Sequence, residues 1–342
     1  MIWLTWRQFR TQAGVVFAAI TVLAVILAVT GPNLAHDYAT GIASCTAHGG
    51  CSAFTDQFFN NHQTLYFGLV AVVMFVPAII GLFWGAPLIT RELEAGTHRL
   101  VWNQSITRTR WLAVKLGLIG LAAMATAGLG SLAVTWWSSP IDKAAFNRFP
   151  RLSPLLFDAR GIAPIGYAAF AFALGVTVGM LIRRTLPAMA AVLAAFAVVQ
   201  MAMPLWIRPH LIAPTRLTTT ITATNLDGFL IQSNGSPVHV TVAVNNPGAW
   251  IISNQTINAA GHVVKGIPVS LSTGACVPAP PPQPPFSQAC FTKISQLGYR
   301  QQVAYQPASR FWAFQWYETA IFLALALALA GFCFWWIRRR LS

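Results

Sequence analysis

Charged residues are scarce in this chain of 342 residues, and acidic residues are the scarcest. Only 9% of the residues are charged, with 8 Asp or Glu against 22 Lys or Arg. A soluble domain carries about 25% charged residues, so this composition excludes an ordinary soluble protein. With 56% hydrophobic residues and a mean hydropathy of +0.58, the chain is predicted to be an integral membrane protein.

The sequence also lacks a phosphate-binding loop of the form G-x-x-x-x-G-K-[S/T], whose backbone amides cradle nucleotide phosphates. No predicted cytoplasmic segment is large enough for a nucleotide-binding domain. The seven histidines are dispersed, and no Ser/His/Asp or Cys/His arrangement has a supporting sequence context. We therefore expect neither enzymatic activity nor a metal site in this chain.

Six apolar segments are long enough to cross a hydrocarbon core of about 30 Å as helices. They are residues 13–31, 65–90, 110–137, 161–182, 185–207 and 313–337. The first eleven residues place aromatic side chains beside Arg7 and Arg10, which is typical of an amphipathic helix in the membrane surface. No clean cleavage site follows the first apolar run, so we expect that run to remain uncleaved as the first transmembrane span. The predicted fold is an all-α membrane protein with six transmembrane helices and an N-terminal elbow helix over residues 1–11.

Basic residues near the span ends predict the orientation, because short cytoplasmic segments are enriched in Lys and Arg. With both termini inside, the cytoplasmic basic residues are Arg7, Arg10, Arg91, Arg99, Arg108, Arg110, Lys115, Arg183, Arg184 and Arg338–Arg340. Residues 138–160 fit poorly, since Lys143, Arg148, Arg151 and Arg160 then lie outside. This distribution also explains the net charge of +14 better than nucleic-acid binding does. We expect a multi-pass plasma-membrane protein of bacterial type.

The largest segment outside the predicted spans covers residues 208–312 and has the character of strands and turns. Its run PVHVTVAVN alternates valines with polar or small residues, as a half-buried strand does. RLTTTITAT and AWIIS are further strand candidates. We predict three regions: 1–207 with spans one to five, a small β-rich extracellular domain over 208–312, and 313–342 with span six and a basic cytoplasmic tail.

Cysteine usage agrees with this orientation. Cys45 and Cys51 share one predicted outer segment, and Cys276 and Cys290 share the other. Because outer segments face an oxidising environment, we predict the disulfides Cys45–Cys51 and Cys276–Cys290. Cys333 lies in an apolar run and is expected to be an inert small side chain.

Ionisable residues are nearly absent from the predicted spans, and Glu318 near the start of the sixth stands out. A carboxylate inside a membrane is a functional candidate by default. Neighbouring Trp and Tyr residues place this one near the membrane surface, so we favour a structural bond to Arg310 or to another span. The scarcity of such carboxylates argues against a proton- or ion-coupled pump and favours an external energy source.

A dense polar segment, RELEAGTHRLVWNQSITRTRWLAVK, interrupts the apolar chain at residues 91–115. Orientation explains its arginines but not Glu92 and Glu94, because acidic residues contribute little to topology. We expect short helices around a break at Gly96–Thr97, facing a soluble cytoplasmic partner.

This segment resembles the permeases of ABC-2 type exporters, in which span two ends in an acidic stretch followed by Gly-Thr, a Ser-Arg element and a lysine in span three. The matching positions are Arg91-Glu92, Glu94, Gly96-Thr97, Thr107-Arg108 and Lys115, while Ser105 stands where many members have Pro. The strings GLFWGAPLITRELEAGTHRLVWNQSITRTRWLAVKL and YQPASRFWAFQWYE are similar to an actinobacterial branch. The resemblance covers most of the chain, is specific over residues 81–115 and is weak in the outer segment.

The resemblance implies an exporter subunit that acts as a dimer, preferably a homodimer, above two copies of a separate ATPase that binds ATP and Mg²⁺. Segment 91–109 would be the ATPase-coupling element, with the site residues Arg91, Glu92, Glu94, Gly96, Thr97, Arg99 and Arg108. Spans two and five line the path in related exporters, so Met74, Phe75, Gln200, Met201 and Met203 are candidates to contact an amphipathic or apolar cargo. The alternative is a membrane sensor whose outer domain binds an envelope ligand or an antimicrobial.

Non-reducing mass spectrometry is expected to detect Cys45–Cys51 and Cys276–Cys290, because both pairs are predicted to lie outside the cell. Cys333, expected to stay a free thiol, serves as the internal control. Free thiols at all the paired positions would contradict the outer placement of these segments.

Overall fold

The computed structural model describes residues 2–47, 50–94, 107–146, 148–231, 238–270, 273–277 and 286–339, without the side chains of residues 2–9, 12, 93 and 231. The chain divides into two units. One, here called the bundle, comprises Met1–Leu211 and Phe311–Ser342. The other, Ile212–Arg310, is called the inserted domain, because it lies in the sequence between the fifth and sixth spans.

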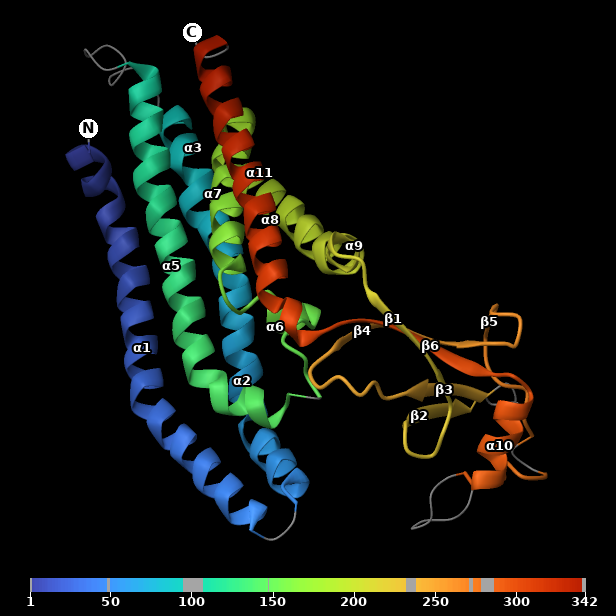
Figure 1. Cartoon of the computed structure of the whole chain (residues 1–342). Coiled ribbons are helices and arrows are strands. Elements are labelled where there is room, and N and C mark those ends of the chain that lie inside the picture. Colours follow the sequence, from blue (N-terminus) through green and yellow to red (C-terminus); the bar gives the residue numbers. More distant parts are fainter. Residues whose placement is uncertain are drawn as a thin grey trace. The chain divides into compact units, whose positions relative to one another are not determined.

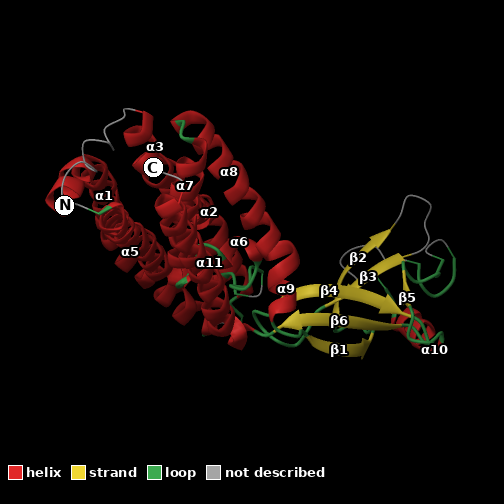
Figure 2. Cartoon of the chain, turned by 90° about the horizontal axis from the view of Figure 1, so that it is seen from above, coloured by secondary structure: helices red, strands yellow, loops and turns green. Residues whose placement is uncertain are grey.

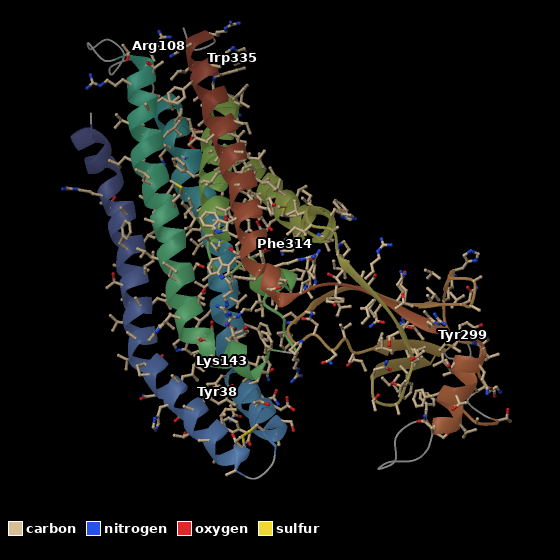
Figure 3. The ribbon with its side chains drawn as sticks, viewed as in Figure 1. Tyr38, Arg108, Lys143, Tyr299, Phe314 and Trp335 are labelled. Carbon is tan, nitrogen blue, oxygen red and sulfur yellow. A yellow bond between two sulfur atoms is a disulfide. The ribbon has the colours of Figure 1, made fainter. Side chains whose placement is uncertain are left out.

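The bundle contains six helical segments long and apolar enough to cross a membrane, which confirms the predicted all-α membrane fold. They are α1 (Ile2–Thr46), α2–η1–α3 (Ser52–Ile80, Gly81–Gly85, Ala86–Glu94), α5 (Arg108–Ala144), α7 (Ala163–Ile182), α8–η2–α9 (Thr185–Ala202, Met203–Ile207, Arg208–Leu211) and α11 (Phe311–Arg339). Successive segments alternate in direction, so α1 begins and α11 ends at the same end of the bundle (Figure 1). We call this the terminal end, where Arg108 and Trp335 lie, and the opposite end, near Lys143, the far end (Figure 3).

The first two helices extend well beyond the predicted spans. The sequence predicts an outer loop between residues 31 and 65, but α1 continues to Thr46 and α2 begins at Ser52. At about 1.5 Å per residue, the 45 residues of α1 exceed a hydrocarbon core of about 30 Å. The projecting turns stay helical because they pack on each other, with ring centroids of Tyr38 and Phe58 5.4 Å apart. The predicted Cys45–Cys51 disulfide joins their ends.

The predicted elbow at the N-terminus is continuous with the first span. α1 is one helix from Ile2 onward, and the first proline that could interrupt it is Pro32. Residues 2–11 are therefore helical and continuous with the first span. Their position in the plane of the membrane stays a prediction.

Spans two and five each contain a π-helical turn beside a proline. Residues Gly81–Gly85 lie between Pro77 and Pro87, and Met203–Ile207 contains Pro204. Proline removes an N–H from the helix ladder, and the ladder adjusts locally. The N–H of Ala86 bonds to the carbonyl of Gly81, and that of Arg208 to the carbonyl of Met203. Beside these prolines the helices thus contain π-turns, which are frequent at functional positions.

Spans two and four approach each other along glycines. A Cβ atom on Gly175 would overlap the carbonyl oxygen of Gly81 and lie 2.8 Å from the amide nitrogen of Ala86. A Cβ on Gly179 would lie 2.7 Å from the carbonyl oxygen of Ala86. Small residues at four-residue spacing let helix backbones pack closely within a membrane, so these two spans form a tightly packed pair.

The inserted domain contains a four-stranded antiparallel sheet in the order β1-β6-β4-β5 and a two-stranded sheet of β2 and β3. The strands are β1 (Thr215–Thr220), β2 (Leu226–Ile231), β3 (Val238–Val242), β4 (Trp250–Ile257), β5 (Val263–Val264) and β6 (Arg300–Gln306). Helix α10 (Gln288–Gln296) lies beside them (Figure 2). Each predicted strand segment forms a strand, and Val238, Val240 and Val242 are buried, as their alternation predicts.

The two ends of the inserted domain are held together by its first and last strands. In the β1–β6 ladder Thr215 lies opposite Tyr305. Beyond it, the Gln306 side chain donates to the carbonyl of Ile212 at 2.7 Å, and Arg310 donates to the carbonyl of Ala213 at 2.8 Å. The first and last residues of the inserted domain therefore lie side by side.

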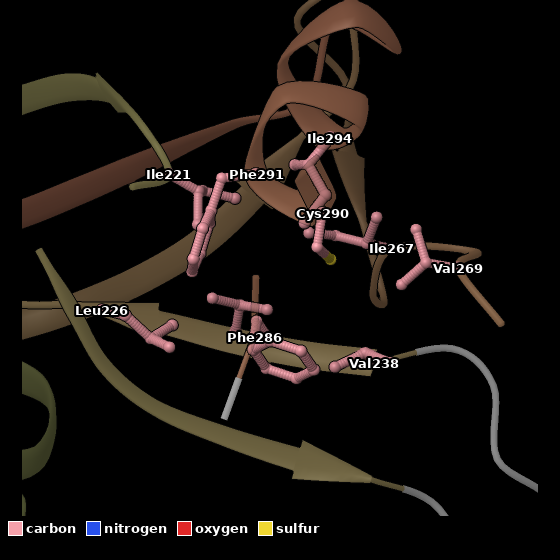
Figure 4. Close-up of a pocket in the computed structure, with 10 residues that line it drawn as sticks. Ile221, Leu226, Val238, Ile267, Val269, Phe286, Cys290, Phe291 and Ile294 are labelled. Carbon is pink, nitrogen blue, oxygen red and sulfur yellow. The ribbon is translucent and has the colours of Figure 1, made fainter. Parts of the chain in front are cut away.

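The core of the inserted domain lies between the two-stranded sheet and α10. It encloses a small pocket with an apolar lining, which includes Val238, Phe286 and Phe291 (Figure 4). Cys290, also in this lining, forms the predicted disulfide with Cys276. The described residues that line the pocket have apolar side chains, so we assign it to the packing of the domain.

Gly175→Ala is expected to destabilise the bundle by about 1–3 kcal/mol, because the added methyl group forces backbone atoms of spans two and four apart. Gly117→Ala in α5 is the matched control, since a Cβ there meets nothing within 4 Å. Thermal unfolding of both variants in nanodiscs measures the difference. Equal unfolding temperatures would show that the two spans are not packed through this glycine.

Candidate functional site

At the terminal end, the last turn of span two carries the two carboxylates predicted to act in coupling. Glu92 accepts a hydrogen bond from Lys115 of α5 at 2.5 Å, and the two side chains are 15% and 3% exposed. The ammonium group of Lys115 also lies 4.7 Å from the centre of the Trp111 ring. Because a lone cation in an apolar interior is costly, the pair holds the end of span two against the start of span three.

Glu94 connects the same turn to span five. Its carboxylate accepts hydrogen bonds from the backbone N–H (2.8 Å) and the hydroxyl (2.7 Å) of Thr185, the first residue of α8. The cap residue of α8, Arg184, makes no side-chain capping bond, so a carboxylate from another span caps the helix. An anion is favourable beside a helix N-terminus, and the hydrogen bonds from Thr185 hold the pKa of Glu94 below its ordinary value.

The tight connection between spans four and five positions Thr185 for these contacts. α7 ends at Ile182 and α8 begins at Thr185, as the sequence predicts. Arg183 between them has a φ of 59°, a left-handed conformation that is uncommon for a residue with a side chain. The hydroxyl of Thr185 also lies 3.0 Å from that of Thr90 in α3. The start of span five is therefore attached to the end of span two by two side chains.

The coupling residues predicted from the sequence are only partly placed. We expected Glu92 and Glu94 to be available to basic residues of a partner, but each has a partner within the chain. Arg91 is exposed, and Arg108 is the first residue of α5. Gly96, Thr97 and Arg99 lie outside the described residues. The role of this set in coupling stays a prediction.

At the far end, the connection between spans three and four turns into the bundle. It contains the short helix α6 (Pro154–Phe157), and every residue from Leu156 to Gly161 is buried. The sequence predicts an outer segment over residues 138–160, and the structure shows that its last part is buried in the protein instead of forming an exposed loop. The side of the membrane on which it lies stays a prediction. The apolar side chains of Leu156 and Phe157 favour burial, and the charged residues that follow find partners inside. We call residues 154–163 the plug.

Arg208 joins the plug to spans five and six. Its guanidinium donates to both carboxylate oxygens of Glu318 in α11, from Nε at 2.9 Å and from Nη2 at 2.8 Å. Nη2 also donates to Asp158 of the plug, and the guanidinium carbon lies 4.1 Å from the centre of the Phe157 ring. Arg208 and Glu318 are both 0% exposed. Three segments that are distant in the sequence thus share one buried cation.

Two further side chains complete this arrangement. The hydroxyl of Tyr167 in span four lies 2.5 Å from Glu318 and 3.1 Å from Asp158, so its one proton can be donated to either carboxylate. Gln200, on the same span as Arg208, donates to Asp158 at 3.1 Å. Burial raises the pKa of Asp158 to about 6, an effect that the Arg208 charge opposes. We call Asp158, Tyr167, Gln200, Arg208 and Glu318 the far-end cluster; its one arginine faces two carboxylates.

A second ion pair holds the other side of the plug. Asp142, at the end of span three, accepts hydrogen bonds from Tyr66 at 2.6 Å and from Arg160 at 3.3 Å. Arg151 approaches the same carboxylate at 3.8 Å. Arg151 and Arg160 are two of the basic residues that fit the predicted topology poorly. Both have a counter-charge in Asp142, which explains how they are accommodated there.

Gln315 of α11 binds the backbone of the plug. Its side-chain oxygen accepts hydrogen bonds from the N–H groups of Ile162 (2.9 Å) and Ala163 (2.8 Å), and its amide donates to the carbonyl of Phe157 at 3.3 Å. The amide side chain therefore caps the N-terminus of α7. It also requires a glycine at position 161, where a Cβ would lie 2.7 Å from the Gln315 oxygen.

These contacts correct the picture of the spans as nearly free of ionisable residues. Glu318 was expected to bond Arg310 or another span, and its partner is Arg208 at the end of span five. Sequence reasoning missed Arg208, Asp158 and Arg160, because they border apolar runs and look like surface residues. The strings WIRPHL and LLFDARGI contain the signal, since each sets charges among large apolar side chains. The argument against ion coupling from a lack of carboxylates loses its support.

The residues predicted to line a transport path differ in how far they are exposed on the single chain. Phe75 and Met201 are 64% and 57% exposed on the single chain, whereas Met203 is 2% exposed. Met74 is half-buried, and Gln200 belongs to the far-end cluster. Their role as path residues stays a prediction. Among the described residues, no group of three His, Cys, Asp or Glu side chains is arranged to hold a metal ion.

Six apolar spans with charged contacts buried between them define a polytopic membrane protein. Residues 17–208 match the sequence model of a family described as ABC-2 membrane transporter related. The match covers more than half of the chain and ends at Arg208, so it includes spans one to five and the plug. The chain therefore belongs to the ABC-2 membrane transporter related family, and it is a multi-pass transporter permease. Comparisons with curated proteins and with solved structures give no match.

Glu92→Ala is expected to lower the stability of the bundle by about 3–5 kcal/mol, because the buried Lys115 loses its carboxylate. The double variant Glu92→Ala with Lys115→Met should recover most of this loss, since methionine fills the space without a charge. Thermal unfolding in nanodiscs, followed by tryptophan fluorescence, measures both. Equal losses in the single and double variants would show that the ion pair is not the cause.

Proposed function

We propose that this chain is the transmembrane permease subunit of an ATP-driven exporter. Its cargo would be amphipathic or apolar, such as a drug, a peptide or a lipid. Family membership supports transport, and the sequence contains no phosphate loop of its own. A separate ATPase with bound ATP and Mg²⁺ would supply the energy, and the permease itself would be non-catalytic.

In this proposal two ATPase subunits act on two permease copies, most simply a homodimer, in the plasma membrane of a bacterium of actinobacterial type. The terminal end faces the cytoplasm, because its helix ends carry Arg108, Arg183, Arg184, Arg338 and Arg339, and cytoplasmic segments are enriched in arginine. The inserted domain then lies outside the cell, where disulfides such as Cys276–Cys290 persist.

The observation that carries the proposal is the set of contacts at the base of segment 91–109. Glu92 connects it to span three through Lys115, and Glu94 connects it to span five through Thr185. Span two also packs against span four through Gly175 and Gly179. A displacement of this segment by an ATPase would therefore reach spans two to five, as a coupling element requires.

A second candidate function is that of a membrane sensor or resistance component whose inserted domain binds an envelope ligand or an antimicrobial. The observation that favours it is the inserted domain itself, an ordered β-sheet unit with its own apolar core and disulfide. Dependence on an ATPase separates the two candidates, because a sensor of this kind does not need to stimulate ATP hydrolysis.

Glu94→Ala is expected to reduce the stimulation of the partner ATPase by about fivefold or more, because the carboxylate that caps α8 and joins span two to span five is lost. Glu94→Gln and Thr185→Ser are the matched controls. Each retains a hydrogen bond between span two and the start of α8, so each should keep most of the stimulation. ATP hydrolysis by the co-purified ATPase in nanodiscs provides the measurement.

The exporter proposal fails if ATP hydrolysis neither requires the permease nor responds to Glu94→Ala. If Glu94→Gln abolishes the stimulation as completely as Glu94→Ala does, the charge of Glu94, and not the helix cap, transmits the signal.

A further inference from the structure

Span five is packed less along its length than spans two to four. Of its most apolar window, 22% of the residues are buried, against 44% in spans two and three and 72% in span four, while the windows of spans one and six are 11% and 17% buried. Within α8, which is fully described, the buried residues are Ala188, Val192 and Phe196. The strong polar contacts of this span lie at its two ends, through Thr185 and Arg208.

The π-turn of span five lies directly before its far-end contact. Residues Met203–Ile207 form the turn, and Arg208 follows it. A proline and a π-turn both weaken the regular ladder of a helix and are common sites of bending. The last residues of span five can therefore change direction relative to α8 without unwinding it.

Arg208 is the residue that fixes this segment in place. It bonds to Glu318 in span six and to Asp158 in the plug, while Gln200, eight residues earlier on span five, bonds to the same Asp158. The plug in turn is bound to span three through Arg160 and Asp142. A movement of span five away from span six must break the bonds between Arg208 and Glu318.

We propose that Asp158, Arg208 and Glu318 form a latch that holds the far end of span five closed, and that its release accompanies the opening of the exit for cargo. This inference deepens the proposed exporter function and rests on it. Arg208 and Glu318 act as positioning residues in this scheme, because neither is required to touch the cargo.

The charges of the latch suit a contact that opens and closes. A dry interior makes the ion pairs strong, whereas water that enters an opening exit solvates the separated charges and reduces the cost of parting them. Arg208 also has two acceptors of the same kind on different segments, so it can leave Glu318 of span six and keep Asp158 of the plug. A switching element requires a contact with two discrete arrangements.

Hydrogen exchange measured by mass spectrometry tests the latch in two settings. In nanodiscs without any ATPase, Asp158→Asn should raise the exchange of amides 157–163 and 205–211 by at least about tenfold, because a charge-assisted bond in the cluster is lost. This variant leaves Arg208 and Glu318 as a neutral pair, so the bundle still folds. Glu318→Gln should act in the same direction, and Arg151→Gln, whose side chain is 45% exposed, is the control without effect.

In the second setting, the wild-type permease is bound to its ATPase and trapped with ATP, Mg²⁺ and vanadate. Exchange at 157–163 and 205–211 should rise relative to the nucleotide-free complex, while amides in the glycine-packed part of span four stay protected. Unchanged exchange in the trapped complex, with normal stimulation of the ATPase, overturns the latch alone. Absence of ATPase stimulation by the wild-type permease overturns the proposed function instead, whatever the exchange shows.

Discussion

A hydrocarbon layer offers no water to a charged side chain, so every charge that this bundle buries has to be compensated inside the protein. Glu92 compensates Lys115, Asp142 compensates Arg160, and Asp158 and Glu318 share Arg208. Each of these contacts joins segments that are separate in the sequence. The pairing of buried charges therefore decides which spans meet at the two ends of the bundle. The inward course of the plug follows from it, because the plug brings Asp158 and Arg160 to their partners.

Between the two ends, packing of small residues takes over from charge. Gly81 and Gly175 allow spans two and four to touch through their backbones, a contact that gains from close approach and not from polarity. Span five has few such contacts and is held at its ends by Thr185 and Arg208. A helix attached in this way can move as one piece when the contact at either end changes. The arrangement links segment 91–109 at one end to the far-end cluster at the other.

The sequence predicts those features that depend on local pattern. Apolar runs predict the six spans, the alternation of Val238, Val240 and Val242 predicts β3, and Arg183–Arg184 marks the tight hairpin, because each signal is carried by adjacent residues. The ends of α1 and α2 could not be predicted, since their extension depends on aromatic packing between two helices. The far-end cluster was missed because it too depends on contacts between segments that are distant in the sequence. Asp158, Arg208 and Glu318 are far apart in the chain, and only the folded bundle brings them together.

The paired charges also clarify the orientation of the chain. The rule that basic residues stay in the cytoplasm concerns charges that water solvates beside the membrane. Arg160, 1% exposed and bonded to Asp142, is not such a charge, and Arg208 is not one either. Arg148 lies 5.6 Å from the centre of the Phe59 ring, so an aromatic face accepts part of its charge. Once these contacts are considered, the far end carries few free arginines, whereas Arg183 and Arg184 at the terminal end are exposed. The far-end arginines thus no longer oppose the proposed orientation with the terminal end in the cytoplasm.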